Sequence, residues 1–221
     1  MATTRREQNR QAKEKRILEA ALTVFSSAGY SGASMDLIAD AAGVSKPTLY
    51  QYFGNKQALF TAMLVPQRDF MLQAFSESEG KDCVTVLYKF AWQYADFVLR
   101  PDILSLARLI IGEAGRIPGI GELYQSVGPD TLRAGIVSYL REQRDAGALR
   151  IDDAELAAED LWGLILSGPR TQALYRPDAV PGKRARAKYI HNGLRVFLSF
   201  YARTPKKALA TLDELIADRK R

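Results

Sequence analysis

Cysteine and histidine are nearly absent from this chain of 221 residues, which contains only Cys83 and His191. A single cysteine excludes an intrachain disulfide, and the two residues are too few for a metal site built from Cys and His ligands. Most catalytic triads also need a histidine base. We therefore expect no catalytic residues, no metal site and no cofactor.

Long apolar runs are also missing. No stretch approaches the ~18 or more uncharged apolar residues of a membrane-spanning helix. The N-terminus carries charges throughout and has no apolar segment of the signal-peptide kind behind them. We expect a cytoplasmic protein that has no membrane partner.

The net charge of +6 is distributed unevenly along the chain. Residues 1–16 carry +4, residues 17–182 carry −6 and residues 183–221 carry +8. The first basic segment is either a solvated tail or a contact to DNA phosphates or the minor groove. The last is expected to face solvent, with salt bridges to the acidic middle as the alternative. The overall charge makes an anionic partner worth testing without naming one.

Apolar residues recur at helical spacing nearly everywhere, and alternating β-branched runs bounded by hairpin dipeptides are missing. This pattern predicts an all-α fold. In the first predicted helix one apolar stripe runs from Ile17 through Phe25 and stops at Gly29, with residues 5–16 as its polar beginning.

Two short helices are predicted next. Ser34 suits the N-cap of a helix through Ala42, and Gly43 can supply the left-handed residue that ends it. Ser45 can cap a second helix that has Pro47 in its first turn, where a missing N–H does no harm. Two helices joined by a short turn containing glycine are typical of a helix-turn-helix.

Further helices are predicted over the remaining chain. Asn55 is expected to cap a helix that runs towards residue 75, and Asp102 to cap another. Asp152 and Glu155 have the spacing of an acidic capping box. The other predicted helices cover about residues 83–100, 103–114, 132–146, 183–201 and 206–220, and residues 115–121 are predicted to form a bend.

The second short helix has the features of a DNA-recognition helix, which needs polar side chains at its N-terminal end and an apolar inner face. Thr48 and Gln51 can contact base edges, whereas neighbouring hydroxyl and ammonium groups can contact phosphates. Leu49 and Phe53 fit the core. The candidate DNA-binding residues are Ser34, Ser45, Lys46, Pro47, Thr48, Tyr50, Gln51, Tyr52 and Lys56.

The same region carries a recognisable pattern over about 45 residues. Its main segments are Ile17-Leu18-Glu19-Ala20-Ala21, Gly29-Tyr30, Ala42-Gly43-Val44-Ser45, Leu49-Tyr50-Gln51-Tyr52-Phe53 and Lys56-Gln57-Ala58-Leu59-Phe60. In these positions the chain resembles the DNA-binding domain of TetR-type repressors. By that resemblance Thr48, Tyr50, Tyr52 and Lys56 align with DNA-contacting positions.

The resemblance extends more loosely into the second half. Arg108–Ala114, Gly128-Pro129 and Glu155–Glu159 look like the C-terminal domain of the AefR-like branch. The implied protein is an all-α homodimer with a DNA-binding domain over residues 1–60 and a helical effector-binding and dimerisation domain over residues 61–221. Ser167-Gly168-Pro169 departs from the family pattern, because proline should kink or split the penultimate dimer helix.

Aromatic residues of the second half are the candidates for an effector site. Each of them alone is better explained as core packing, but together with a few polar groups they suit an apolar cavity between helices. The candidate effector-binding residues are Trp92, Tyr94, Arg108, Tyr124, Trp162, Gln172 and Tyr175. We expect Cys83 to be an inert thiol and His191 to be a surface or interface residue.

These patterns favour a transcriptional repressor that binds double-stranded DNA at a near-palindromic operator and is released by a small molecule with an apolar or aromatic part. One alternative is a helical small-molecule-binding protein whose DNA-binding head is non-functional. Another is a helical enzyme that uses carboxylates such as Glu113 or Glu159. The polar face of the short helix argues against the first alternative, and the shortage of catalytic residues argues against the second.

Overall fold

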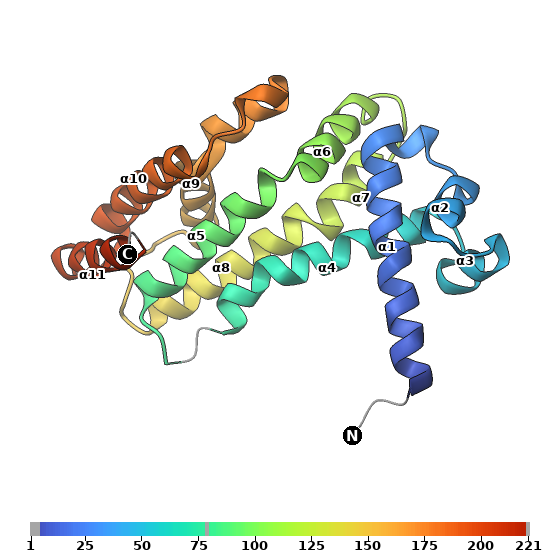
Figure 1. The fold of residues 1–221 in the computed structure, drawn as a ribbon. Helices are drawn as coiled ribbons and strands as arrows, with labels where there is room; N and C mark the ends of the chain where they lie inside the picture. The colour runs from blue at the N-terminus through green and yellow to red at the C-terminus, as the bar shows by residue number, and fades with distance from the viewer. Residues whose placement is uncertain (1–4, 78–79, 220–221) are drawn as a thin grey trace. The chain divides into compact units, whose positions relative to one another are not determined.

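The computed structural model describes residues 5–77 and 80–219, and helices make up most of this part of the chain (Figure 1). The predicted all-α fold is confirmed. Extended pairing within the described residues is limited to an isolated bridge between Leu149 and Ala202. None of the described helices is long and apolar enough to cross a membrane.

The helices follow one another with short connections. They are α1 (Arg5–Gly32), α2 (Met35–Ala42), α3 (Lys46–Phe53), α4 (Lys56–Ser76), α5 (Cys83–Val98), α6 (Pro101–Glu113), α7 (Ile120–Val127), α8 (Pro129–Asp145), α9 (Ala154–Tyr175), the 3-10 helix η1 (Pro177–Ala179), α10 (Lys183–Tyr201) and α11 (Pro205–Asp218).

The chain forms two compact units, and neither is continuous in sequence. The first unit contains the residues up to Arg68 together with Pro101–Pro129. The second contains Asp69–Arg100 and Asp130–Arg221. Helices α6 and α7 therefore belong with the helix-turn-helix, and the division predicted after residue 60 stays a prediction.

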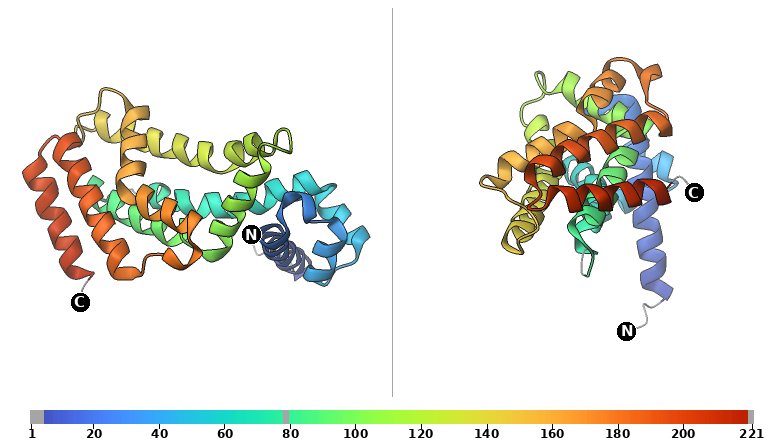
Figure 2. Two further views of the ribbon diagram at one scale, coloured as in Figure 1. Left: turned by 90° about the horizontal axis from the view of Figure 1, so that it is seen from above. Right: turned by 90° about the vertical axis from the view of Figure 1, so that its left-hand side faces the viewer.

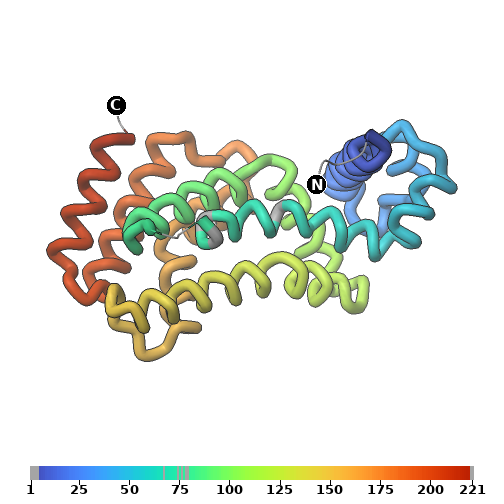
Figure 3. The backbone as a smooth tube through the Cα atoms, turned by 90° about the horizontal axis from the view of Figure 1, so that it is seen from below, coloured from blue at the N-terminus to red at the C-terminus, as the bar shows by residue number. Residues whose placement is uncertain are grey.

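The core of the first unit forms around α1. Ile17, Phe25, Leu49 and Phe60 are fully buried there, and the ring centroids of Phe25 and Phe60 lie 5.1 Å apart. Helix α1 packs against both α2 and α6. Figure 3, which views α1 nearly along its axis, shows α2 and α3 beside it. This packing holds the short helices in place, although helices of eight residues are marginal on their own.

The predicted caps of the helix-turn-helix are confirmed. The Leu37 N–H donates to Ser34 Oγ at 3.1 Å. Gly43 ends α2 with a φ of 60°, a left-handed conformation that favours glycine. Ser45 caps α3, which has Pro47 in its first turn, and the Ala58 N–H donates to Asn55 Oδ1 at 2.8 Å.

The polar beginning predicted for the first helix is confirmed, because residues 5–16 are helical in α1 and are rich in Glu, Gln, Lys, Arg and Ala, which all favour helices. Two other predicted boundaries were wrong. Asp102 lies inside the first turn of α6, because that helix already begins at Pro101. Pro129 likewise begins α8 before the predicted start at residue 132, and proline suits a first helical turn.

Two further differences lie in the second half of the chain. The predicted bend at residues 115–121 runs into α7, which starts after Gly119 at a φ of 81° and buries Ile120. Asp153, not Asp152, caps α9, because Asp153 Oδ1 is the oxygen that accepts from the Leu156 N–H, at 2.9 Å.

The second unit is centred on α5, which is apolar around most of its circumference and is buried along its length. The most extensive packing in this unit is between α9 and α10, and α10 and α11 lie side by side (Figure 2). A Cβ at Gly193 of α10 would lie 2.4 Å from the Leu164 carbonyl oxygen of α9. Glycine at this position therefore lets the two backbones approach closely. Helix α9 continues through Pro169 and is not split.

Candidate nucleic-acid interface

Helix α3 presents a polar face and anchors itself by an apolar one. Leu49 is fully buried, as predicted, whereas Phe53 is only half-buried. The predicted DNA-binding residues of this helix and its cap lie at the surface or half-exposed. Ser34, Ser45, Lys46, Pro47, Tyr50 and Gln51 are exposed, and Thr48 and Tyr52 are half-buried.

Local contacts orient the start of α3. Ser45 Oγ and Thr48 Oγ1 lie 2.8 Å apart, so the N-cap hydroxyl is hydrogen bonded to a predicted base-contacting side chain. Lys46 Nζ lies 2.8 Å from a carboxylate oxygen of Asp36 on α2, and this hydrogen bond raises the pKa of Lys46. Both partners are mostly exposed, and surface pairs of this kind are weak. This ion pair therefore does little to hold the Lys46 ammonium in place.

The Lys56 side chain contacts other residues of the first unit in this structure. Its Nζ donates to the Ala33 carbonyl at 2.8 Å and lies 4.5 Å from the ring centroid of Tyr30. Burial lowers the pKa of Lys56, and the nearby charge of Glu113 opposes that change. The ammonium group thus ties α4 to the end of α1, and its predicted phosphate contact stays a prediction.

Glu113, at the end of α6, binds the same turn from another side. Its carboxylate accepts the Tyr30 N–H at 2.8 Å and the Ser31 N–H at 3.0 Å. Gly29 precedes them with a φ of 74° and a ψ of 177°, which leaves these amides outside the regular helical pattern. No spacing in the sequence connects residues so far apart, so this contact was not predicted.

Glu113 and Glu159 were the carboxylates on which an enzymatic alternative depended. The first is held by backbone amides, as described above. Glu159 is exposed and lies 3.2 Å from Arg133. Neither carboxylate is buried among apolar groups in the way that a general acid needs.

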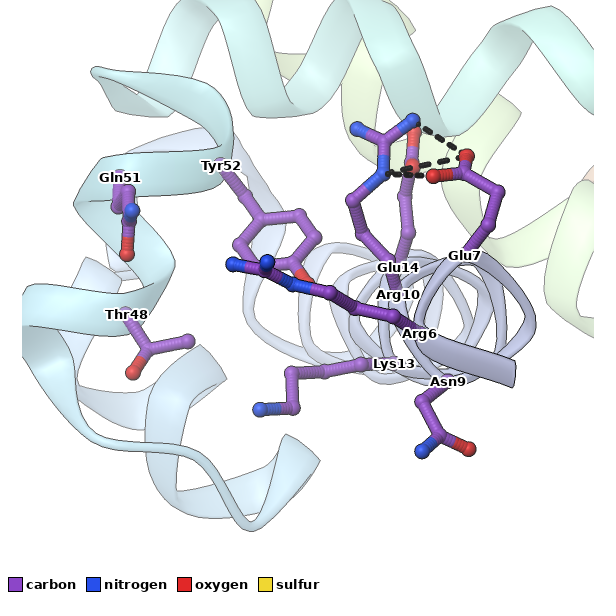
Figure 4. A pocket seen from close by; sticks show the side chains of 9 residues that line it. All are labelled: Arg6, Glu7, Asn9, Arg10, Lys13, Glu14, Thr48, Gln51 and Tyr52. Carbon is purple, nitrogen blue, oxygen red and sulfur yellow. Dashed lines mark hydrogen bonds and ion pairs between the residues drawn. The ribbon is translucent and has the colours of Figure 1, made fainter. Parts of the chain in front are cut away.

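A concave surface, which encloses a volume of about 590 Å³, lies between the N-terminal half of α1 and the polar face of α3 (Figure 4). Thr48, Gln51 and Tyr52 line it from α3. The α1 side contributes Arg6, Glu7, Asn9, Arg10, Lys13 and Glu14. None of these α1 residues was a predicted site residue, although the cations at positions 6, 10 and 13 have the i, i+4, i+7 spacing of one helix face.

The predicted effector residues are divided between the two units. Arg108 and Tyr124 belong to the first unit, and the other five belong to the second. Trp92 and Tyr94 are buried in α5, and the ring centroids of Tyr94 and Trp162 lie 5.0 Å apart. Gln172 and Tyr175 are exposed, the latter by 83%. An effector role for these residues stays a prediction.

The two scarce residues occupy structural positions. Cys83 is buried, and this burial raises the pKa of its thiol to about 12, so the reactive thiolate is scarce near neutral pH. His191 is half-buried, with Nε2 3.4 Å from the Tyr88 hydroxyl. Among the residues that the structure describes, no cluster of His, Cys, Asp and Glu could hold a metal ion.

Two protein-family models match different parts of this chain. Residues 17–63 match the family of bacterial regulatory proteins of the tetR type, and residues 85–203 match the AefR-like transcriptional repressor C-terminal domain. The HTH-type transcriptional regulator RutR of Escherichia coli K12 is 51% identical over 53 residues, which are 24% of this chain and 25% of RutR. The chain thus matches about a quarter of that relative's length.

Solved structures extend the likeness to most of the chain. A putative TetR-family transcriptional regulator from Mesorhizobium loti is 28% identical, with a TM-score of 0.72 over 90% of this chain and 100% of that one. The Flavonoid-responsive Regulator FrrA is 29% identical, with a TM-score of 0.66 over 87% and 98%. With a helix-turn-helix at its N-terminus and the AefR-like domain over more than half its length, this chain belongs to the TetR family of DNA-binding transcriptional regulators, which are not enzymes.

Proposed function

We propose that this protein is a homodimeric repressor that binds a near-palindromic operator and leaves it when a small molecule binds. In this proposal residues 1–60 bind DNA and residues 61–221 bind the effector and the second subunit. The observation that carries the proposal is the amphipathic recognition helix: Leu49 is fully buried while Lys46 and Gln51 on the same helix are exposed.

A gel shift with the DNA upstream of the gene for this protein tests operator binding. We expect a shift that weakens as salt rises, because phosphate contacts release counterions. A scrambled duplex of the same composition is the control and should bind less tightly. If neither this DNA nor a selection from random sequences yields a preferred site, the protein is not a sequence-specific repressor.

Two substitutions separate base contacts from phosphate contacts. Thr48→Ala should relax the preference at one operator position, because the hydroxyl and methyl that contact a base edge are lost. In this proposal the Lys56 ammonium exchanges the Ala33 carbonyl for a phosphate in the complex, so Lys56→Ala should weaken binding to all sequences alike and reduce the salt slope by about 1. Binding to operators with single base changes, measured at several salt concentrations, checks both. Equal changes in preference would contradict this division of roles.

The dimer interface is proposed to lie on α9 and α10. Tyr189, Val196 and Phe200 are exposed at spacings of seven and four residues, which place them on one side of α10. Leu156 and Tyr175 of α9 are exposed as well. Exposed apolar groups in such a row are typical of a helical interface. A two-fold dimer would place its recognition helices on half-sites about 34–36 Å apart, or a multiple of this spacing.

The effector is proposed to bind in the second unit. FrrA is named for its response to flavonoids, so a flavonoid is the first compound to test. Trp92 offers a donor there, because its buried Nε1 has no hydrogen-bond partner among the described residues. An effector releases the operator only if it binds the released state more tightly than the DNA-binding state.

Tryptophan fluorescence and DNA binding together test the effector proposal. We expect a flavonoid to quench the emission of Trp92 and to lower the affinity for the upstream duplex. Trp92→Phe should reduce the quenching, with Trp162→Phe as the comparison variant. Quenching without any effect on DNA affinity would instead favour a small-molecule-binding protein whose head does not respond.

A further inference from the structure

The N-terminal basic segment is a helix, and this limits what it can contact on DNA. Helix α1 begins at Arg5 and has the usual α-helical diameter of about 10–12 Å. The minor groove of B-DNA is only about 6 Å wide, so a helix cannot enter it. The major groove admits one helix, and α3 is the helix that fills it in the proposed complex. The surface left for α1 is the sugar-phosphate backbone.

The cations of this segment are not equivalent. Arg10 Nη2 lies 2.8 Å from Glu7, and Glu14 acts on Arg10 as a second negative charge. Arg6 and Lys13 form no ion pair with any residue that the structure describes. In Figure 4 their side chains extend from α1 towards α3, whereas Arg10 turns to Glu7. Two free positive charges therefore face the concave surface beside Thr48 and Gln51.

The separation of these two residues suits separate phosphates. Seven residues of α-helix span about 10 Å, and each DNA strand carries one phosphate per 3.4 Å of duplex axis. Arginine and lysine at this spacing can therefore bind different phosphates of the strand that borders the groove. Such contacts fix the register of a recognition helix and supply affinity that is independent of sequence.

We propose that Arg6 and Lys13 of α1 bind the DNA backbone beside the major groove that receives α3, so that the strand bordering the groove lies between α1 and α3. This inference rests on the proposed DNA binding and adds a second element to the interface. It assigns the first basic segment to phosphates and not to the minor groove, and it gives the two free cations a role that Arg10 does not share.

The test compares two double variants that remove the same charge from the same helix. Arg6→Ala/Lys13→Ala removes the cations that line the concave surface. Arg5→Ala/Lys15→Ala is the matched control, because neither Arg5 nor Lys15 lines it. Alanine favours helices, so both variants should keep α1, which circular dichroism checks. Binding is followed by fluorescence anisotropy with a labelled upstream duplex and a scrambled duplex over several salt concentrations.

The expected result is a lower salt slope for Arg6→Ala/Lys13→Ala, by about 0.9 for each lost contact and hence about 1.8 per chain. The control should keep a slope close to that of the wild type, and the preference between the two duplexes should be the same in both variants. Equal slopes in the two variants would overturn the inference, because the position of a cation on α1 would then make no difference to DNA binding. A changed preference would also overturn it, in favour of base readout.

These outcomes are distinct from a failure of the proposed function. If the wild-type protein binds the upstream and scrambled duplexes equally, the proposed operator is wrong, but the slopes still test the backbone contact. If the wild type binds neither duplex at low salt, both proposals are overturned.

Discussion

At the residue scale, two side chains from other helices bind the backbone at the C-terminal end of α1. Glu113 binds the Tyr30 and Ser31 amides, and Lys56 binds the Ala33 carbonyl. The first two contacts satisfy amides that the break at Gly29 leaves outside the helical pattern, and the third binds a carbonyl just beyond the end of α1. The position of α2 and α3 relative to α1 therefore depends on side chains from α4 and α6.

Gly29→Ala should destabilise the protein. At a φ of 74° and a ψ of 177° the backbone occupies a region that is almost restricted to glycine, which costs other residues about 1–3 kcal/mol. The new Cβ would also lie 2.9 Å from Glu113 Oε1 and disturb the carboxylate. Urea unfolding at a fixed protein concentration measures the loss.

Gly112→Ala is the control for that experiment. Gly112 lies in α6, beside Glu113, and a Cβ there would meet nothing within 4 Å. This substitution should be neutral or stabilise by up to about 1 kcal/mol, because alanine favours helices more than glycine. If both variants lost the same stability, the conformation of Gly29 would not be the cause.

At the element scale, helix ends and crossings are set by single positions. Asp153 caps α9, while Asp152, one residue earlier in the chain, does not. Gly193 lets α10 approach α9 so closely that even a methyl group would clash with the backbone. These two features fix where α9 begins and how tightly it packs, so each can be tested by one substitution.

Asp153→Ala should cost about 1 kcal/mol of unfolding free energy. The substitution removes the oxygen that accepts the Leu156 N–H at 2.9 Å and leaves an amide of the first turn unpaired. Asp152→Ala should have an effect of a few tenths of a kcal/mol at most. Denaturant midpoints of the two variants compare them directly, and the reverse order would make Asp152 the cap, as the sequence had suggested.

Gly193→Ala should force α9 and α10 apart. Overpacking of this kind costs about 1–3 kcal/mol, which exceeds the gain of up to about 1 kcal/mol in helix propensity. Gly163→Ala in α9 is the matched change without a neighbour within 4 Å, and it should not destabilise. Thermal unfolding of both variants at equal concentration checks the difference. An unchanged melting temperature for Gly193→Ala would show that the crossing is looser than described.

At the scale of the whole molecule, the two compact units share the chain in an interleaved order. Residues 69–100 leave the first unit, and α6 and α7 return to it before the chain completes the second. The C-terminal charge of +8 belongs to the second unit, where Arg186 lies 2.6 Å from Asp96 of the acidic middle. At one position at least, the basic residues 183–221 therefore form a predicted salt bridge to the acidic residues 17–182.

Phe200→Asp should convert a dimer into a monomer. Phe200 is 65% exposed on the proposed interface of α10, and a carboxylate there would be desolvated or would repel its symmetry mate. Sedimentation velocity should show about twice the 24.6 kDa chain mass for the wild type and the single mass for the variant. Ile111→Asp is the control, since Ile111 is 66% exposed in the first unit. A dimeric Phe200→Asp variant would place the interface elsewhere.

The sequence by itself determined the helix-turn-helix and the all-α class, because caps, glycine positions and apolar periodicity act over a few residues. Ser34, Gly43 and Ser45 have their predicted roles for this reason. Only the tertiary structure decided which distant groups meet. The Glu113 contact to the end of α1, the close approach at Gly193 and the facing of Arg6 and Lys13 towards α3 depend on packing between elements that no local pattern encodes.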